Sequence, residues 1–186
     1  MTTTEIINEA ESNMKKTVEV VKKEFASMRA GRATPALLDK ITVNYYGTPT
    51  PVNQLANISV PEARLLLIQP WDKTALPEIE KAILKSDLGI TPASDGVVIR
   101  LTIPQLTRER RVELMKVIKK KAEEGRVAIR NIRRDTNDQL KSQQKEGKIS
   151  EDDLKRKQED VQKMTDRMIK DIDALLANKE QEIMQV

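Results

Sequence analysis

The residues best suited to chemistry are arginines gathered in one short stretch. Residues 126–135 read RVAIRNIRRD, and at about 100° per residue its four arginines fall in one sector of a helix. They are Arg126, Arg130, Arg133 and Arg134. A guanidinium is planar and always charged, so it can donate paired hydrogen bonds to phosphate or carboxylate oxygens. This face is predicted to contact an RNA backbone, and a solvated charged helix face is the alternative.

The same sector continues toward the start of the predicted helix. Arg108, Lys116 and Lys119 fall in it, and Glu123 is the only acid between residues 108 and 134 placed well inside it. A solvated helix usually intersperses acids, so this pattern favours a polyanionic partner. Residues 105–134 are strongly basic and residues 150–186 are acidic on balance. That asymmetry indicates either two complementary helices packed together or a body with one RNA-facing side.

Composition excludes most catalytic chemistry. The 186-residue chain has no histidine and no cysteine, so it offers no imidazole base, no thiolate and no ordinary zinc site. Its glycines are too scattered for a phosphate-binding loop. Glu151–Asp153 could suggest a metal site, but acids at the start of a helix favour its positive dipole end, and we expect a cap there. We therefore expect no enzymatic activity, no catalytic residue, no metal and no cofactor.

Aromatic residues are rare, at 2% of the chain. Base stacking on an aromatic platform is therefore largely unavailable, and any nucleic-acid contact should be mainly electrostatic. We expect Tyr45, Tyr46 and Trp71 to be packing residues. The sequence shows no stretch of about 20 apolar residues and no signal peptide, which predicts a cytoplasmic protein with no membrane association.

Periodicity predicts an α+β unit inserted between long helices. An amphipathic helix covers residues 3–29 and ends at Gly31 and Pro35. Alternating runs then predict strands at 41–45, 56–60, 64–68 and 97–103, with a turn over 47–51. A short helix is expected from a Thr74 cap through Leu88.

The helical period returns from Thr107. Apolar residues continue to Leu140, residues 145–148 break the helix, and Ser150 is expected to cap a final helix. We predict a three-helix bundle of residues 1–30 and 105–186 with an inserted β/α/β domain of residues 31–104. Both crossings are short, so relative motion is expected there. The predicted hinge residues are Ala30, Gly31, Arg32, Ile103, Pro104 and Gln105.

Five motifs together resemble the bacterial ribosome recycling factor family over essentially the whole chain. They are Arg29–Pro35 (RAGRATP), Tyr45–Ala56 (YYGTPTPVNQLA), Ser86–Gly89 (SDLG), Pro104–Arg111 (PQLTRERR) and Val127–Asp135 (VAIRNIRRD). The resemblance implies a three-helix bundle with a hinged β/α/β domain, in an L shape that mimics transfer RNA. Our expectation of an inserted unit agrees with that fold.

The resemblance also implies a function. A non-enzymatic factor of this kind enters the post-termination ribosome and binds large-subunit ribosomal RNA. With elongation factor G and GTP it promotes subunit splitting and the release of messenger RNA and deacylated transfer RNA. Arginines matching Arg130 and Arg133 are implied to be important for attachment, and Arg29, Arg110 and Arg134 are weaker correspondences. We expect a monomer that does not bind DNA.

Two other classes remain to be compared with this one. A helical RNA-binding adaptor or chaperone-like protein would explain the helices and the charges, but not a doubly connected β unit beside an arginine stripe. A nucleotide-dependent enzyme would need the phosphate loop, imidazole or thiol that the chain lacks.

Overall fold

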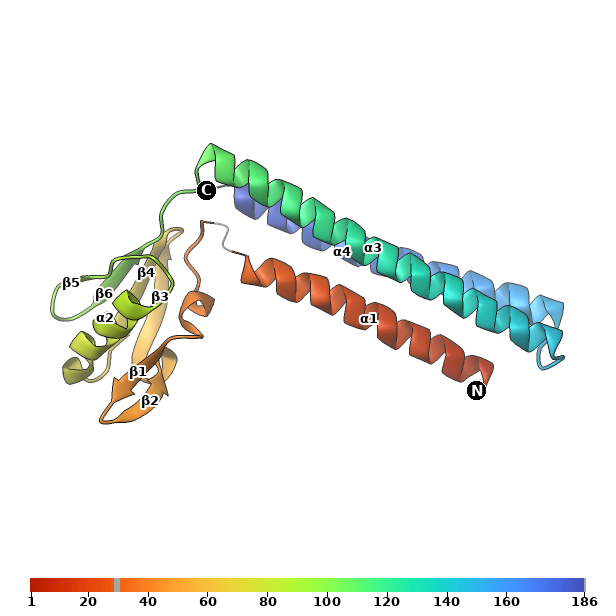
Figure 1. Ribbon diagram of the computed structural model, residues 1–186, viewed down its shortest axis with the longest axis horizontal. Helices are drawn as coiled ribbons and strands as arrows, with labels where there is room; N and C mark the ends of the chain where they lie inside the picture. The colour runs from red at the N-terminus through yellow and green to blue at the C-terminus, as the bar shows by residue number, and fades with distance from the viewer. Residues whose placement is uncertain (29–30, 186) are drawn as a thin grey trace. The chain divides into compact units, whose positions relative to one another are not determined.

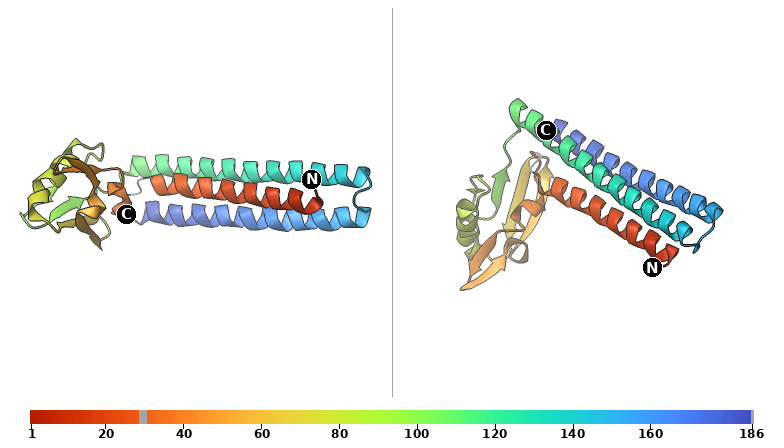
Figure 2. Two further views of the ribbon diagram at one scale, coloured as in Figure 1. Left: turned by 90° about the horizontal axis from the view of Figure 1, so that it is seen from below. Right: turned by 45° about the vertical axis from the view of Figure 1, so that its right-hand side comes forward.

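Long amphipathic helices from both ends of the sequence form one of the two parts of the molecule. Within residues 1–28 and 31–185, which the computed structural model describes, three helices lie side by side: α1 (Thr3–Ser27), α3 (Arg108–Lys145) and α4 (Glu151–Met184) (Figures 1 and 2). They belong to one compact unit, residues 1–28 with 108–185, and residues 31–107 form the other. Each helix buries one apolar stripe, and Met14, Ile118 and Ile172 have no or almost no exposed surface. None of these helices can bury its apolar stripe alone, so packing the three stripes into a shared core stabilises them.

Side chains cap the helices of this bundle at the positions where the backbone lacks partners. The Thr2 hydroxyl accepts from the Glu5 N–H at 3.1 Å, and the Glu5 carboxylate accepts from the Thr2 N–H at 2.9 Å. Ser150 accepts from the Asp153 N–H at 3.0 Å, which confirms the predicted cap of α4. The acids at the start of α4 therefore lie at the positive end of its dipole.

The second unit is built on an antiparallel sheet. In the described part of this unit the strand order is β3–β4–β6–β5, with bounds Ala56–Glu62, Leu65–Pro70, Ile99–Thr102 and Ala93–Ser94. Helix α2 (Leu76–Lys85) contributes Ile79 and Ile83 to a core that includes Ile68 and Ile99 of the sheet. The 3₁₀ turns η1 (Pro35–Leu38), η2 (Val52–Gln54) and η3 (Lys73–Ala75) connect these elements. The predicted α+β class, a helical bundle with a β/α/β domain, is confirmed.

Two local predictions in this unit are wrong. Of residues 47–51 only Gly47 lies in a turn, and the rest form strand β2 (Thr48–Pro51), which pairs with β1 (Thr42–Tyr45). Prolines fit there because β2 pairs with β1 alone in a two-stranded hairpin, where alternate N–H groups need no partner. Thr74 is not a helix cap: the Asp72 carboxylate accepts from the Thr74 N–H at 2.9 Å, and α2 begins only at Leu76.

The aromatic residues also differ from expectation. Tyr46 is 80% exposed and Trp71 is 61% exposed, so neither packs in the core, and only Tyr45 is partly buried against it. Tyr46 occupies the hairpin loop beyond the last pair, Tyr45 with Thr48, where no neighbouring strand covers it. Trp71 follows the buried Pro70, and the alternation of a strand sends it outward.

In the described ranges, no helix combines the length and the apolar character required to cross a membrane.

Candidate RNA-binding face of the bundle

Contacts between helices define which side of α3 carries the arginines. Arg126 contacts Asp173 of α4, and Arg133 donates to Gln162 of α4 at 3.3 Å. On another side of α3, Lys121 pairs with Glu24 of α1 at 3.2 Å. The predicted arginine stripe therefore lies along the α3–α4 interface and the solvent-facing surface beside it.

Arg126 is partly buried between α3 and α4. Its Nε and Nη2 lie 2.8 and 2.7 Å from Asp173 Oδ1, and its Nη1 lies 3.0 Å from Glu123 Oε2. Only 19% of its side chain is exposed. Partial burial disfavours its charge, but the hydrogen bonds to Asp173 and Glu123 outweigh this and raise the pKa of Arg126. All three guanidinium nitrogens have a carboxylate partner, so Arg126 ties α3 to α4 and keeps fewer open donors than Arg130 or Arg134.

Glu123 joins two of the arginines. Its Oε2 accepts from Arg126, and its Oε1 accepts from Arg130 Nη1 at 3.2 Å. These two hydrogen bonds lower the pKa of Glu123, because they favour its charged form. The acid that the sequence placed inside the basic sector is therefore bound within it.

Arg130, Arg133 and Arg134 keep donors available. Arg130 uses only Nη1, and in the described chain its Nε and Nη2 have no protein partner. Arg133 is half-buried and uses one nitrogen on the neutral amide of Gln162. Arg134 is exposed and makes no hydrogen bond or ion pair with the described residues. Three positive side chains within about one helical turn can therefore face an external anion.

The other predicted contact residues are separate from this group. Arg110 lies in the first turn of α3, more than three turns away, and pairs with Glu113 at 3.0 Å. Arg29 lies outside the described residues, as does the predicted hinge residue Ala30. The structure thus brings Arg126, Arg130, Arg133 and Arg134 together and leaves Arg110 apart.

The two connections between the units are both hydrogen-bonded to the same turn of the inserted unit. The Ala33 N–H donates to the Ala63 carbonyl at 2.8 Å, and the Ile103 N–H donates to the Arg64 carbonyl at 2.7 Å. Residues 63 and 64 form the turn between β3 and β4, so one turn holds both crossings. Gly31 has φ +75°, a conformation that favours glycine, and Arg32, Pro104 and Gln105 are exposed.

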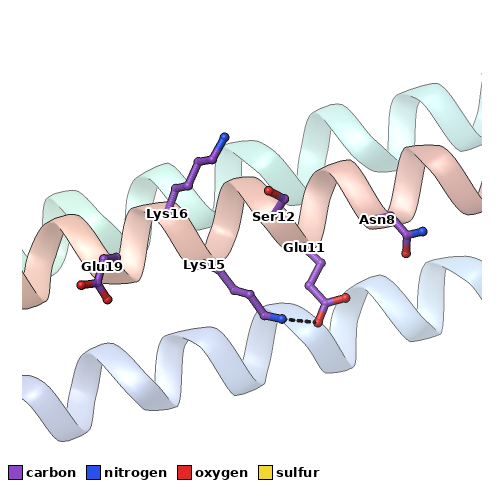
Figure 3. Close-up of a pocket in the computed structure, with 6 residues that line it drawn as sticks. All are labelled: Asn8, Glu11, Ser12, Lys15, Lys16 and Glu19. Atoms are coloured by element: carbon purple, nitrogen blue, oxygen red, sulfur yellow. Dashed lines mark ion pairs between the residues drawn. The ribbon is translucent and has the colours of Figure 1, made fainter.

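A second surface, on α1, offers a comparison. A shallow hollow there is lined by Asn8, Glu11, Ser12, Lys15, Lys16 and Glu19 (Figure 3). Lys15 pairs with Glu11 at 3.3 Å, and Glu11 also accepts from Arg167 of α4 at 3.3 Å. Acids balance the lysines on this surface, and no arginine lines it, so it lacks the excess positive charge of the α3 face.

Sequence reasoning missed two partners in the candidate site, Asp173 and Gln162. Both belong to α4, and only the antiparallel pairing of α3 with α4 brings them to the arginines. Among the residues described, no cluster of three metal-binding side chains is present.

The comparisons with known proteins agree on one family. The family model described as ribosome recycling factor matches residues 21–184. The chain belongs to the ribosome recycling factor family. It is 85% identical to the ribosome-recycling factor of Pelotomaculum thermopropionicum and 71% identical to that of Desulforamulus reducens, each over 98% of both chains.

Solved structures of this family share the fold. The chain resembles a solution structure of ribosome recycling factor with a TM-score of 0.77 and 46% identity, covering 99% of this chain and 98% of that one. It also resembles the T. thermophilus factor in a structure with E. coli elongation factor G on the E. coli post-termination complex. That match has a TM-score of 0.66 and 48% identity, and covers 99% of this chain and 100% of the other.

Proposed function

We propose that this chain recycles ribosomes after termination. It attaches to large-subunit ribosomal RNA through Arg130, Arg133 and Arg134 of α3. With elongation factor G and GTP it promotes subunit splitting, so that messenger RNA and deacylated transfer RNA leave. The chain itself performs no covalent step, and GTP hydrolysis belongs to the partner. It works in the cytoplasm as a monomer.

The observation that carries this proposal is the set of available arginine donors beside a helix interface. Arg130 and Arg134 have donors that no described residue uses, and Arg133 is held only by a neutral amide. A phosphate backbone presents anionic oxygens at regular spacing, which suits donors repeated along a helix. The T. thermophilus relative described with a post-termination complex and elongation factor G supports the choice of partners.

Arg133→Ala tests the attachment. A hydrogen bond to a charged group contributes about 1.5–3 kcal/mol, so affinity for large subunits should fall roughly ten- to a hundredfold. Arg167→Ala is the matched control, because Arg167 is an exposed arginine of the same bundle that pairs with Glu11 across the α1–α4 interface. It should bind as the wild type does.

Filter binding to purified large subunits measures both variants, and circular dichroism checks that both fold. Wild-type affinity should also weaken with salt, with a log–log slope of about −3 for three phosphate contacts. If Arg133→Ala and Arg167→Ala bind equally well, the RNA face has been assigned to the wrong side of the bundle. Wild-type splitting is measured by light scattering of post-termination ribosomes with elongation factor G and GTP, with each component omitted in turn.

We further propose that the inserted unit is a domain that moves against the bundle during splitting. The turn at residues 63–64 holds Ala33 and Ile103 within that domain, so the pivot consists of the flanking residues, including Gly31, Arg32, Pro104 and Gln105. Such short connections can absorb a rotation without unfolding either core.

A reversible lock tests this motion. One cysteine in the last turn of α1 and one in the inserted unit, selected as a pair that oxidises in the purified protein, join the two parts. The chain has no native cysteine to compete. The oxidised form should bind large subunits normally and fail to split ribosomes, and reductant should restore splitting. Full activity of the oxidised form would show that the motion is unnecessary.

A further inference from the structure

Four charged side chains of alternating sign form a continuous chain from α4 to the surface of α3. Asp173 holds Arg126 at 2.7 and 2.8 Å, Arg126 holds Glu123 at 3.0 Å, and Glu123 holds Arg130 at 3.2 Å. The first three members neutralise one another in part, and the last presents a cation to the solvent. We call this set, Asp173–Arg126–Glu123–Arg130, the charge relay.

Exposure changes along the charge relay in a way that separates support from contact. The Arg126 side chain is 19% exposed, whereas that of Arg130 is 43% exposed. Arg126 has a carboxylate on each guanidinium nitrogen, whereas Arg130 has one on Nη1 alone, with no described partner at Nε or Nη2. A planar guanidinium held at one nitrogen is restrained in orientation and keeps its other donors for a ligand.

We propose that Glu123 and Asp173 are positioning residues that orient Arg130 for a phosphate of ribosomal RNA, with Arg126 as the connecting clamp. This inference depends on the proposed function, because it assumes that Arg130 contacts RNA. A free arginine side chain loses rotamer entropy when it binds a ligand, and the relay removes part of that loss before binding. Anchoring on α4 matters because it ties Arg130 to the packed bundle rather than to one helix turn.

The direction in which one substitution changes binding affinity distinguishes a positioning role from simple electrostatics. Glu123→Gln removes a negative charge from a surface that should face a polyanion, so electrostatics alone predicts tighter binding. Positioning predicts weaker binding, because a neutral amide holds two guanidinium groups poorly. Residues coupled in one hydrogen-bonded network depend on one another, so we expect affinity to fall about twofold or more.

The experiment is a double-mutant cycle with purified large subunits at one fixed salt concentration. Binding is measured for wild type, Glu123→Gln, Arg130→Ala and the double variant. Glu124→Gln is the matched control, because Glu124 is an exposed glutamate next in sequence with no part in the relay. Asp173→Asn tests the far end of the relay and should also weaken binding, by less than Glu123→Gln.

Each outcome decides a separate question. Weaker binding by Glu123→Gln alone, with no further loss when Arg130 is already alanine, supports the relay. Binding by Glu123→Gln at or above the wild-type affinity overturns it. So does an equal loss in both backgrounds, since Glu123 would then act by another route. If Arg130→Ala itself binds normally, the proposed contact of Arg130 with RNA fails instead.

Discussion

Gly125 lies where α3 approaches both other helices, and adding one methyl group there tests how tightly the bundle is packed. A Cβ atom on Gly125 would lie 2.8 Å from Val21 Cγ2 of α1 and 3.1 Å from Ile172 Cδ1 of α4. Carbon atoms in contact prefer about 3.5–4.0 Å, so the methyl group would overlap Val21 by roughly 0.7 Å or more. Val21 is β-branched and buried, so it has no alternative rotamer that is free of cost.

Two opposing effects set the expected magnitude for Gly125→Ala. Overpacking a core costs about 1–3 kcal/mol, whereas replacing glycine by alanine inside a helix gains about 1 kcal/mol. We therefore expect the free energy of unfolding of the bundle to fall by about 0–2 kcal/mol. Urea denaturation followed by circular dichroism at 222 nm measures this difference.

Making the same substitution in a Val21→Ala protein separates overpacking from helix propensity. Val21→Ala removes the methyl group that would clash, so adding Gly125→Ala to it should raise stability by up to about 1 kcal/mol relative to Val21→Ala alone. A change of sign between the two backgrounds is the expected result. If Gly125→Ala stabilises the wild type by the full helix-propensity gain, the helices are not in close contact at this position and the packing argument is refuted.

Two further predictions concern the inserted unit. Tyr46 has φ +50° and the next residue, Gly47, has φ +80°, so the hairpin turn is left-handed at both positions. Asparagine tolerates this conformation, so Tyr46→Asn should raise the free energy of unfolding by about 0.5–1 kcal/mol in thermal melts. A fall in that free energy would mean that the ring contact between Tyr46 and Tyr45 outweighs the backbone strain. Hydrogen bonds from Thr74 and from the Tyr45 hydroxyl lower the pKa of Asp72 in the folded protein. The ionised Asp72 therefore stabilises the fold fully above the unfolded-state pKa of about 3.9. This stabilisation disappears as pH falls through the lower folded-state pKa. Asp72→Asn should therefore reduce the urea midpoint at pH 7 and differ less from wild type as pH falls toward 2, and a gap that does not change with pH would contradict this.

Periodicity was sufficient for the long helices because their sequences carry local and repeated signals. The apolar stripe from Leu114 to Leu140 and the Ser150 cap are both properties of residues within a few turns of one another. The same reasoning failed at Thr48–Pro51, where prolines suggested a turn. A proline is acceptable in a strand only if its missing N–H faces no partner, and that depends on which strands lie beside it.

The aromatic residues show the same limit. Composition indicates that Tyr46 and Trp71 should be buried, since large apolar rings usually are. Tyr46 is exposed because it lies in the loop of the β1–β2 hairpin, whereas Trp71 is exposed because it follows the end of β4, a strand that pairs with the distant segment β6. The aromatic character of a residue does not by itself show where the strand beside it ends.

The sequence by itself determined the fold class and the arginine sector of α3, because helical spacing converts residue order directly into faces. Its five motifs carried the resemblance to a family. The roles within that sector were decided only by the tertiary structure. The packing of α4 against α3 brings Asp173 to Arg126 and Gln162 to Arg133, and it leaves the outer donors of Arg130 and all of Arg134 without described protein partners. Electrostatic interactions act over a few ångströms in space whatever the separation in sequence, so a clamp and a contact residue on one helix face become distinguishable only once the neighbouring helix is in place.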